Sequence, residues 1–280
     1  MRYGLKASCI LFGLAVVVPG LCSQATNAHE VAPTNLRATH LQHLEERLNS
    51  SVEDLREQCR FESDIPTAPP KGLVALTFDD GPDPEHTAKI LAILDRYQVP
   101  ATFFVIGEKV ERHPELIQAI QANGRHLLGS HTWTHPNFHD IPSPEQQLEL
   151  ARGIEVLPPD HAPQLFRYPY GNASCFANDY LHSRGVAIVG WHVDSCDWAF
   201  DRIGTVDSKE ALSCGVGSEY RGDFVGHVAS SVRARRGGII LLHEIHAITP
   251  ARLGELIEEI RHDGYTFVRL DDPRFAPSLR

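Results

Sequence analysis

Residues 73–82 read Leu-Val-Ala-Leu-Thr-Phe-Asp-Asp-Gly-Pro, an apolar run that ends in two carboxylates and a turn. The run predicts a buried strand, and Gly-Pro is typical of the turn that ends one. Similar apolar runs occur at 102–106, 127–129, 186–191, 239–242 and 266–270. Stretches typical of helices lie near 85–97, 109–123, 143–156, 174–184 and 250–262. This alternation predicts a parallel sheet, as an α/β barrel or an open sheet, with the chemistry at the carboxyl ends of its strands.

The first residues are typical of a secretory signal peptide. Arg2 and Lys6 precede an apolar run over 7–18. Pro19 and Gly20 end the run, and small residues follow. This order predicts a signal peptide over residues 1–25. Cys22 follows a bulky leucine, so lipoprotein anchoring at Cys22 is not expected. We therefore expect an exported protein, periplasmic or extracellular, with no integral membrane segment after cleavage.

Residues 26–70 are predicted to form a helical extension and a linker. A stripe at helical spacing is formed by Leu41, Leu44, Leu48, Val52, Leu55 and Cys59. It predicts a helix packed on the main domain, which we favour over a dimerising coil because the stripe is too short for sustained heptads. Ser50 can instead start a second helix. The prolines near residue 70 make a stiff linker, and the catalytic domain is expected over 71–280.

Charge and cysteine content narrow the function classes. The chain has a formal charge of −10, which becomes −12 without Arg2 and Lys6. An acidic protein is a poor partner for nucleic acid or an anionic membrane, and a neutral or cationic polymer fits better. Four cysteines remain after the signal peptide: Cys59, Cys175, Cys196 and Cys214. In an exported protein they predict disulfides, with three pairings open.

Two clusters have residue types that suit a metal centre. Asp79 and Asp80 are adjacent at the end of a strand, so one carboxylate can bind a cation while the other stays free as a base. His131 and His135 lie four residues apart, and they can point the same way if the chain enters a helical turn. Two imidazoles and one carboxylate form a metal site with open positions. Taken alone, the clusters can also be a solvated acidic turn and a surface histidine pair.

Three further segments follow predicted strands. Arg167 can orient a carboxylate through a bidentate contact, and the turn at Tyr170 can aim a backbone N–H at an oxyanion. His243, paired with a buried aspartate such as Asp197, can act as a general acid. Trp198 and Leu241 can wall a small apolar pocket. The alternatives are a core aromatic turn with a surface arginine, and a structural histidine.

The five segments together resemble the polysaccharide deacetylases of carbohydrate esterase family 4, the NodB-homology domain, over roughly residues 70–272. The resemblance implies a distorted (β/α)7-type barrel and an N-deacetylase that acts on an N-acetylglucosamine polymer. It implies one divalent metal ion, Zn²⁺ or else Co²⁺, Ni²⁺, Mn²⁺ or Fe²⁺, bound by Asp80, His131 and His135. It implies that Asp79 is the base and that Arg167 orients Asp79. It implies that His243 is the acid, that Asp197 tunes His243, and that Tyr170 is the oxyanion donor. Trp198 and Leu241 would line the acetate pocket. A metal-activated water is the implied nucleophile.

The sequence leaves several points open. Glu244 stands where the family often has Asp, and we expect no consequence. The stretch 200–235 is long, and we expect a substrate-shaping loop, with Cys214 bridged to Cys196 or Cys175. The alternatives in function are an O-acetyl esterase of the xylan type and a non-catalytic glycan-binding protein. Peptidoglycan is favoured over chitin oligosaccharides because no chitin-binding module is evident. A glycan on the sequon at Asn172 would obstruct the site, which favours a bacterial origin.

Overall fold

The computed structural model describes residues 59–159 and 164–280. All described residues belong to one compact unit. The predicted signal peptide over 1–25 and most of the predicted helical extension lie outside the described residues. None of the helices in the described part combines the length and the apolar character that a membrane crossing needs.

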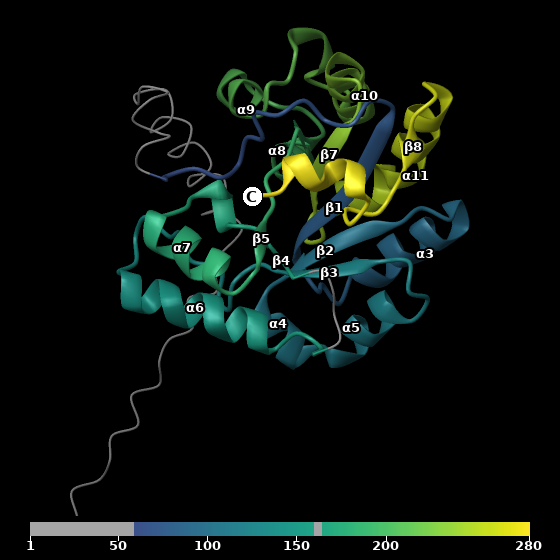
Figure 1. The fold of residues 1–280 in the computed structure, drawn as a ribbon. Helices are drawn as coiled ribbons and strands as arrows, with labels where there is room; N and C mark the ends of the chain where they lie inside the picture. Colours follow the sequence, from purple (N-terminus) through teal and green to yellow (C-terminus); the bar gives the residue numbers. More distant parts are fainter. Residues whose placement is uncertain (1–58, 160–163) are drawn as a thin grey trace, which may run out of the picture. The chain divides into compact units, whose positions relative to one another are not determined.

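A parallel sheet forms the centre of the described chain (Figure 1). Its strands are β1 (Leu73–Gly81), β2 (Ala101–Val105), β3 (Leu127–Ser130), β4 (Leu165–Phe166), β5 (Ala187–Ile188), β6 (Val193–Asp194), β7 (Gly238–His243) and β8 (Thr266–Phe267). Their order is β5-β4-β3-β2-β1-β7-β6, and β8 pairs with the start of β1. The end strands β5 and β6 follow each other in the chain, as in a sheet curled toward a barrel. The predicted distorted barrel is thus confirmed as a parallel half-barrel with helices around it.

The helices are α3 (Thr87–Tyr97), α4 (Gly107–Arg112), α5 (Pro114–Gln121), α6 (Ser143–Glu155), α7 (Cys175–Ser183), α8 (Asp197–Ile203), α9 (Ser208–Cys214), α10 (Phe224–Arg235) and α11 (Ile248–His262). The single helix predicted over 109–123 is two helices, because Pro114 cannot continue α4 and instead begins α5. The loop predicted over 200–235 was wrong in large part, since α9 and α10 occupy most of it. Asp207 and Glu210 form a capping box at the start of α9.

Strand β1 is buried along its whole length, because β2 and β7 flank it and helices cover it. Such a strand has apolar side chains on both faces, which is why 73–78 lacks a polar alternation. Phe78 stacks on Phe103 of β2, with ring centroids 5.2 Å apart. On the helix side, Ile90 and Leu94 of α3 are fully buried in the same cluster. The long buried strand therefore holds the Asp79–Asp80 end in a rigid position.

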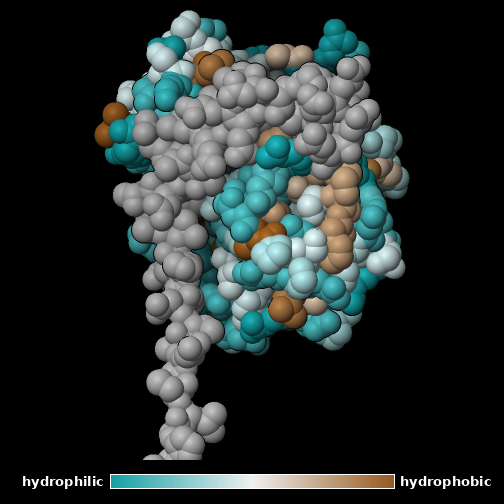
Figure 2. Space-filling model, turned by 90° about the vertical axis from the view of Figure 1, so that its left-hand side faces the viewer, coloured by the Kyte–Doolittle hydropathy of each residue, from teal (hydrophilic) through white to brown (hydrophobic). Residues whose placement is uncertain are grey.

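The surface of the described residues is mostly polar. On the face shown in Figure 2, most of the coloured surface is hydrophilic or neutral. The exposed large hydrophobic side chains among the described residues are Leu148, Phe176, Ile203 and Leu212. Isolated exposed apolar side chains are ordinary for a folded domain, so they indicate no binding site.

Candidate active site

Asp79 and Asp80 lie at the carboxyl end of β1 and point to different partners. Asp79 is in register with His243 on β7, whereas a bulge follows it in the pairing with β2. Asp80 adopts a left-handed backbone conformation, with φ of 70°. Both residues are buried, at 3 % and 4 % exposure. The irregular backbone brings two adjacent carboxylates to one cavity, where a regular strand would point them to opposite faces.

His131 and His135 follow β3, and both approach Asp80. The Oδ1 atom of Asp80 lies 3.1 Å from Nε2 of His135 and 3.4 Å from Nε2 of His131. The segment is a tight turn, not the helical turn that we expected, because Thr132 and His135 both have left-handed φ values. The Thr132 side chain accepts a hydrogen bond from the His135 N–H at 2.9 Å. Local side-chain hydrogen bonding has replaced the helix here.

Glu149 of α6 supports this turn, and it was not among the residues predicted from the sequence. Its carboxylate accepts hydrogen bonds from the N–H groups of Trp133 and Thr134, at 3.0 and 2.8 Å, and from the Thr134 hydroxyl at 2.8 Å. Nothing in its sequence position distinguishes Glu149 from an exposed helical glutamate. Its role comes from the packing of α6 against β3.

The Asp80, His131 and His135 group fits a divalent metal ion. One ligand atom from each residue lies within 4.8 Å of the others. Oδ1 of Asp80 is buried and has no hydrogen-bond donor among the described residues. His131 Nδ1 lies 2.8 Å from the Arg167 carbonyl, an arrangement that leaves Nε2 for a metal. Burial raises the pKa of Asp80, but His135 and His131 lower it more, so the net pKa is well below its usual range.

Arg167 is completely buried and holds Asp79. Its Nη1 donates to Oδ1 of Asp79 and to Oγ1 of Thr77, each at 2.8 Å. The carbonyls of Val189 and Gly190 accept from Nε and Nη2 at 3.1 and 3.0 Å. The bidentate contact expected from the sequence is therefore not formed, because the remaining guanidinium donors bind backbone. Burial lowers the pKa of Arg167, and Asp79 partly offsets that effect.

His243 and Asp197 form a buried pair on the other side of Asp79. His243 Nδ1 lies 2.7 Å from Oδ1 of Asp197, and the His243 N–H donates to Oδ2, also at 2.7 Å. The Thr249 hydroxyl donates to the same Oδ2 at 2.7 Å. Burial alone would lower the pKa of His243, but the Asp197 carboxylate raises it to about 10. The imidazolium form is thus stable near neutral pH.

Tyr170 lies in a short 3-10 turn, Pro169–Gly171, with a left-handed φ of 59°. Its ring packs edge-on against His135, with the centroids 4.8 Å apart. Burial raises the pKa of its phenol, so the hydroxyl is neutral. The turn therefore brings Tyr170 beside His135, one of the candidate metal ligands.

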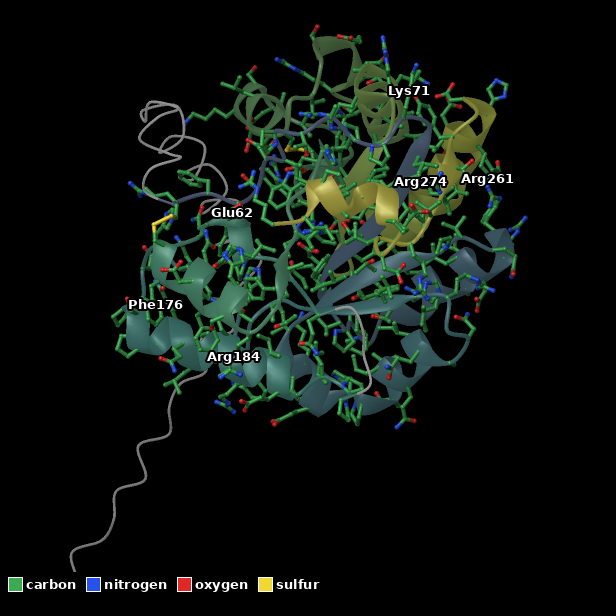
Figure 3. All side chains as sticks on the ribbon, in the orientation of Figure 1. Glu62, Lys71, Phe176, Arg184, Arg261 and Arg274 are labelled. Carbon is green, nitrogen blue, oxygen red and sulfur yellow. A yellow bond between two sulfur atoms is a disulfide. The ribbon has the colours of Figure 1, made fainter. Side chains whose placement is uncertain are left out.

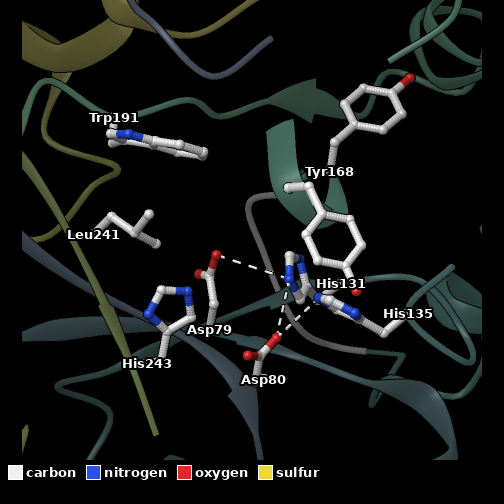
Figure 4. Close-up of a pocket in the computed structure, with 9 residues that line it drawn as sticks. Asp79, Asp80, His131, His135, Tyr168, Trp191, Leu241 and His243 are labelled. Atoms are coloured by element: carbon white, nitrogen blue, oxygen red, sulfur yellow. Dashed lines mark ion pairs between the residues drawn. The ribbon is translucent and has the colours of Figure 1, made fainter. Parts of the chain in front are cut away.

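These side chains surround one pocket (Figure 4). It is lined by Asp79, Asp80, His131, His135, Tyr168, Tyr170, Trp191, Leu241 and His243. Trp198 was expected in this lining but packs in the core cluster, because it lies in the first turn of α8 where that helix faces the core. Trp191 lies near Leu241 and Asp79 in Figure 4 and provides an apolar wall. The sequence predicts Trp191 at the end of the buried strand 186–191, and only this strand-end position indicates a place near the pocket.

The structure also decides the cysteine pairing and whether Asn172 can carry a glycan. The disulfides join Cys59 to Cys175 and Cys196 to Cys214. Asn172 is 1 % exposed, and its amide donates to Oδ1 of Asn137 at 2.8 Å. A buried amide that is already hydrogen-bonded cannot carry a glycan in the folded chain.

Comparisons with known proteins show that this chain is similar to deacetylases in sequence and fold. A family model described as polysaccharide deacetylase matches residues 67–189. The peptidoglycan-N-acetylglucosamine deacetylase PgdA of Listeria monocytogenes serotype 1/2a (strain 10403S) is 30% identical over 211 residues, which are 75% of this chain and 40% of that protein. The chain thus spans well under two thirds of the length of this relative. A Bacillus cereus peptidoglycan-N-acetylglucosamine deacetylase is 30% identical over 206 residues, 71% of this chain and 87% of the relative.

Further similarity extends to a chitooligosaccharide deacetylase and to solved structures. The Bradyrhizobium sp. (strain ANU 289) chitooligosaccharide deacetylase is 38% identical over 179 residues, 61% of this chain and 70% of the relative. The crystal structure of the Bc1960 peptidoglycan N-acetylglucosamine deacetylase superposes with a TM-score of 0.57 at 31% identity, over 71% of this chain and 86% of that one. A Streptomyces lividans family 4 carbohydrate esterase in complex with acetate gives a TM-score of 0.56 at 26% identity, over 70% and 91%.

Proposed function

The chain belongs to the polysaccharide deacetylase family, and on that premise we propose that it hydrolyses N-acetyl groups of an N-acetylglucosamine polymer. One observation carries the proposal. A possible metal-ligand set of Asp80, His131 and His135 shares a buried pocket with a second carboxylate, Asp79, and with the cationic His243. An amide hydrolase needs a metal, a base and an acid at one point, and this pocket supplies residues for all three.

Asp80, His131 and His135 would hold the metal, which we take to be zinc. A bound divalent cation supplies Lewis acidity, which lowers the pKa of water and polarises a carbonyl. His131 is oriented by the Arg167 carbonyl, and His135 is packed against Tyr170. The ligands are therefore held in position by neighbours that do not themselves bind the metal.

Asp79 takes the proton from the attacking water. Its Oδ1 is held by Arg167 at 2.8 Å, while Oδ2 faces the ligand side, 3.8 Å from Nε2 of His131. One oxygen is thus fixed and the other is directed toward the place where water would be activated. Arg167 acts as the positioning residue for this base, and its two backbone acceptors keep the guanidinium from rotating.

His243 donates the proton that allows the amine to leave. An amide nitrogen is a poor leaving group unless it is protonated, so the acid must stay charged at the working pH. Asp197 secures this by raising the pKa of His243 to about 10. The Tyr170 N–H would bind the oxyanion of the tetrahedral intermediate, an interaction worth about 3 kcal/mol in comparable sites.

Trp191 and Leu241 provide the apolar wall for the acetyl methyl group in this proposal. Both line the pocket, with Asp79 and His243 close by (Figure 4). The family resemblance assigned Trp198 to this wall, but Trp198 lies in the core cluster and does not line the pocket.

We favour peptidoglycan as the substrate, with chitin oligosaccharides second, and an exported location after cleavage of residues 1–25. Relatives named for each substrate exist, and the acidic chain suits a neutral or cationic glycan better than a polyanion. The test is mass spectrometry of peptidoglycan fragments, chitin oligomers and acetylated xylan after incubation with the zinc-loaded protein. We expect acetyl loss from the first two. Loss from xylan alone would indicate an O-acetyl esterase, and no loss from any glycan would indicate a non-catalytic binding protein.

A further inference from the structure

We propose that residues 60–65, here called the strap, are a positioning element for the reaction. The strap runs across two turns of the active site, one around Tyr170 and one at Gly190–Trp191, and pairs with both through isolated β-bridges. This inference rests on the proposed function, because it concerns the oxyanion donor and the residue that orients the base. The 26–70 extension was expected to end in a linker, yet these six residues pack on the barrel.

The first turn is held by backbone hydrogen bonds from both directions. The Glu62 N–H donates to the Gly171 carbonyl at 2.9 Å, and the Ala173 N–H donates to the Arg60 carbonyl at 2.7 Å. The contact is so close that a Cβ on Gly171 would lie 2.4 Å from Cβ of Ser63. Tyr170, the residue before Gly171, has a left-handed φ, a conformation that is unfavourable for residues other than glycine. Contacts from outside the turn must therefore maintain it.

The second turn, at Gly190–Trp191, connects the strap to Arg167, which holds the proposed base Asp79. The Trp191 N–H donates to the Ser63 carbonyl at 2.8 Å, and the Ile65 N–H donates to the Trp191 carbonyl at 3.4 Å. Gly190 has no room for a side chain, since a Cβ there would lie 2.4 Å from the Ser63 oxygen. The Gly190 carbonyl in turn accepts from Arg167, which holds Asp79. A displaced strap would therefore release one anchor of the guanidinium.

The strap is fastened at points outside the pocket. The Cys59–Cys175 disulfide ties its start to α7. Glu62, labelled in Figure 3, accepts from the Asn178 amide at 3.0 Å and pairs with Arg280. Arg280 also donates to the Asp64 carbonyl at 3.0 Å. The disulfide and the Arg280 contacts can be removed by substitution without changing any residue of the proposed catalytic set.

The test compares wild type with a variant that carries Cys59→Ser, Cys175→Ser and Arg280→Ala. We expect kcat to fall on the order of 10- to 100-fold, as for a displaced catalytic group, with KM changed less than about threefold and zinc content unchanged. Arg280→Lys in the same background without the Cys59–Cys175 disulfide restores the pairing charge and should recover part of kcat. Arg274→Ala is the matched control, because Arg274 is an exposed arginine whose guanidinium donates to Asp272, away from the strap.

Amide hydrogen exchange gives a readout that does not need a substrate. In the loosened variant, peptides over 169–173 and 189–192 should lose protection, whereas the peptide over 127–135 should keep it. Wild-type protection in both turns would overturn the proposal. So would a lower Tm combined with a wild-type kcat, which is the mark of a merely structural strap. If wild type itself deacetylates none of the glycans, the proposed function fails, while the exchange result still decides whether the strap holds the turns.

Discussion

His243 and Asp197 are joined twice, through the imidazole Nδ1 and through the backbone N–H of His243, each 2.7 Å from a different carboxylate oxygen. This double contact fixes both the position of the histidine and the face of its ring. Because His243 Nδ1 is hydrogen-bonded to Asp197, Nε2 is the nitrogen that can donate a proton to the substrate. The carboxylate is buried, so its charge acts on His243 with little screening.

Replacing Asp197 with asparagine should move the alkaline limb of the kcat/KM profile to lower pH. Asp197 raises the pKa of His243 to about 10, and a general acid is active only below its pKa. Without the negative charge that pKa falls, so the acid is lost at lower pH. Asp201→Asn, one helical turn along α8, is the control and should leave the profile in place. An unmoved limb in Asp197→Asn would mean that His243 is not the titrating acid.

Asp79→Asn should abolish turnover while the protein keeps its metal. Removing a general base typically costs about 10²- to 10⁴-fold in rate, and the asparagine can still occupy the site beside Arg167. Acetate release and zinc content, measured on the same preparation, check the two halves of this prediction. A metal-loaded variant that works at the wild-type rate would take the role of base away from Asp79.

His135→Ala should weaken metal binding itself. Its Nε2 lies 3.1 Å from the Asp80 carboxylate, and loss of one of three protein ligands leaves a poor site. Metal content after dialysis against a chelator is the measurement. His182→Ala, an exposed histidine on α7, should retain wild-type metal content.

Glu244→Gln should remove a pH dependence of stability. Burial raises the pKa of Glu244 to about 8, with Thr87 and Lys109 opposing the shift. The folded protein thus keeps a proton that the unfolded chain loses above about pH 4.5. The contribution of Glu244 to the free energy of unfolding is complete below that pH and is lost as the pH rises toward 8. The free energy of unfolding then falls by up to about 1.4 kcal/mol per pH unit. The measurement is urea unfolding between pH 5 and 8 of wild type, Glu244→Gln and the exposed control Glu115→Gln. Equal slopes of unfolding free energy against pH in all three proteins would contradict the prediction.

Trp191→Ala should raise KM and lower kcat for N-acetylated oligomers, because the acetyl group loses an apolar wall. Burial of a methyl group beside an aromatic ring is worth roughly 1 kcal/mol, so a change of about five- to tenfold in kcat/KM is expected. Trp133→Phe, on the histidine turn but outside the pocket lining, is the comparison. No change in kcat/KM for Trp191→Ala would remove Trp191 from the acetyl pocket.

Much of the site could be predicted from short sequence segments. Asp79, Asp80, His131, His135 and His243 follow predicted strands, and parallel strands bring their carboxyl ends to one edge. The predicted distorted barrel is confirmed as a parallel half-barrel, and the structure brings these residues into one pocket. Their chemical roles stay predictions until the variants are measured.

Other features have no local signal. Glu149 and the strap act through contacts with segments far away in the chain, Thr134 and Gly171 among them. Trp191 and Trp198 are close in sequence, and helix packing alone decides which of them lines the pocket. The cysteines allowed three pairings, and the fold selects Cys59–Cys175 and Cys196–Cys214.

The amino-acid order alone thus specified the strands, their chemically active ends and the family to which the chain is similar, because periodicity and strand-end motifs are local properties. The distances between the site residues did not follow from the amino-acid order. Whether Asp79 and Asp80 share one cavity depends on a left-handed residue, a bulge and a buried arginine held by distant carbonyls. Such conformations are costly in an isolated segment, and they persist only when the surrounding packing compensates for their cost.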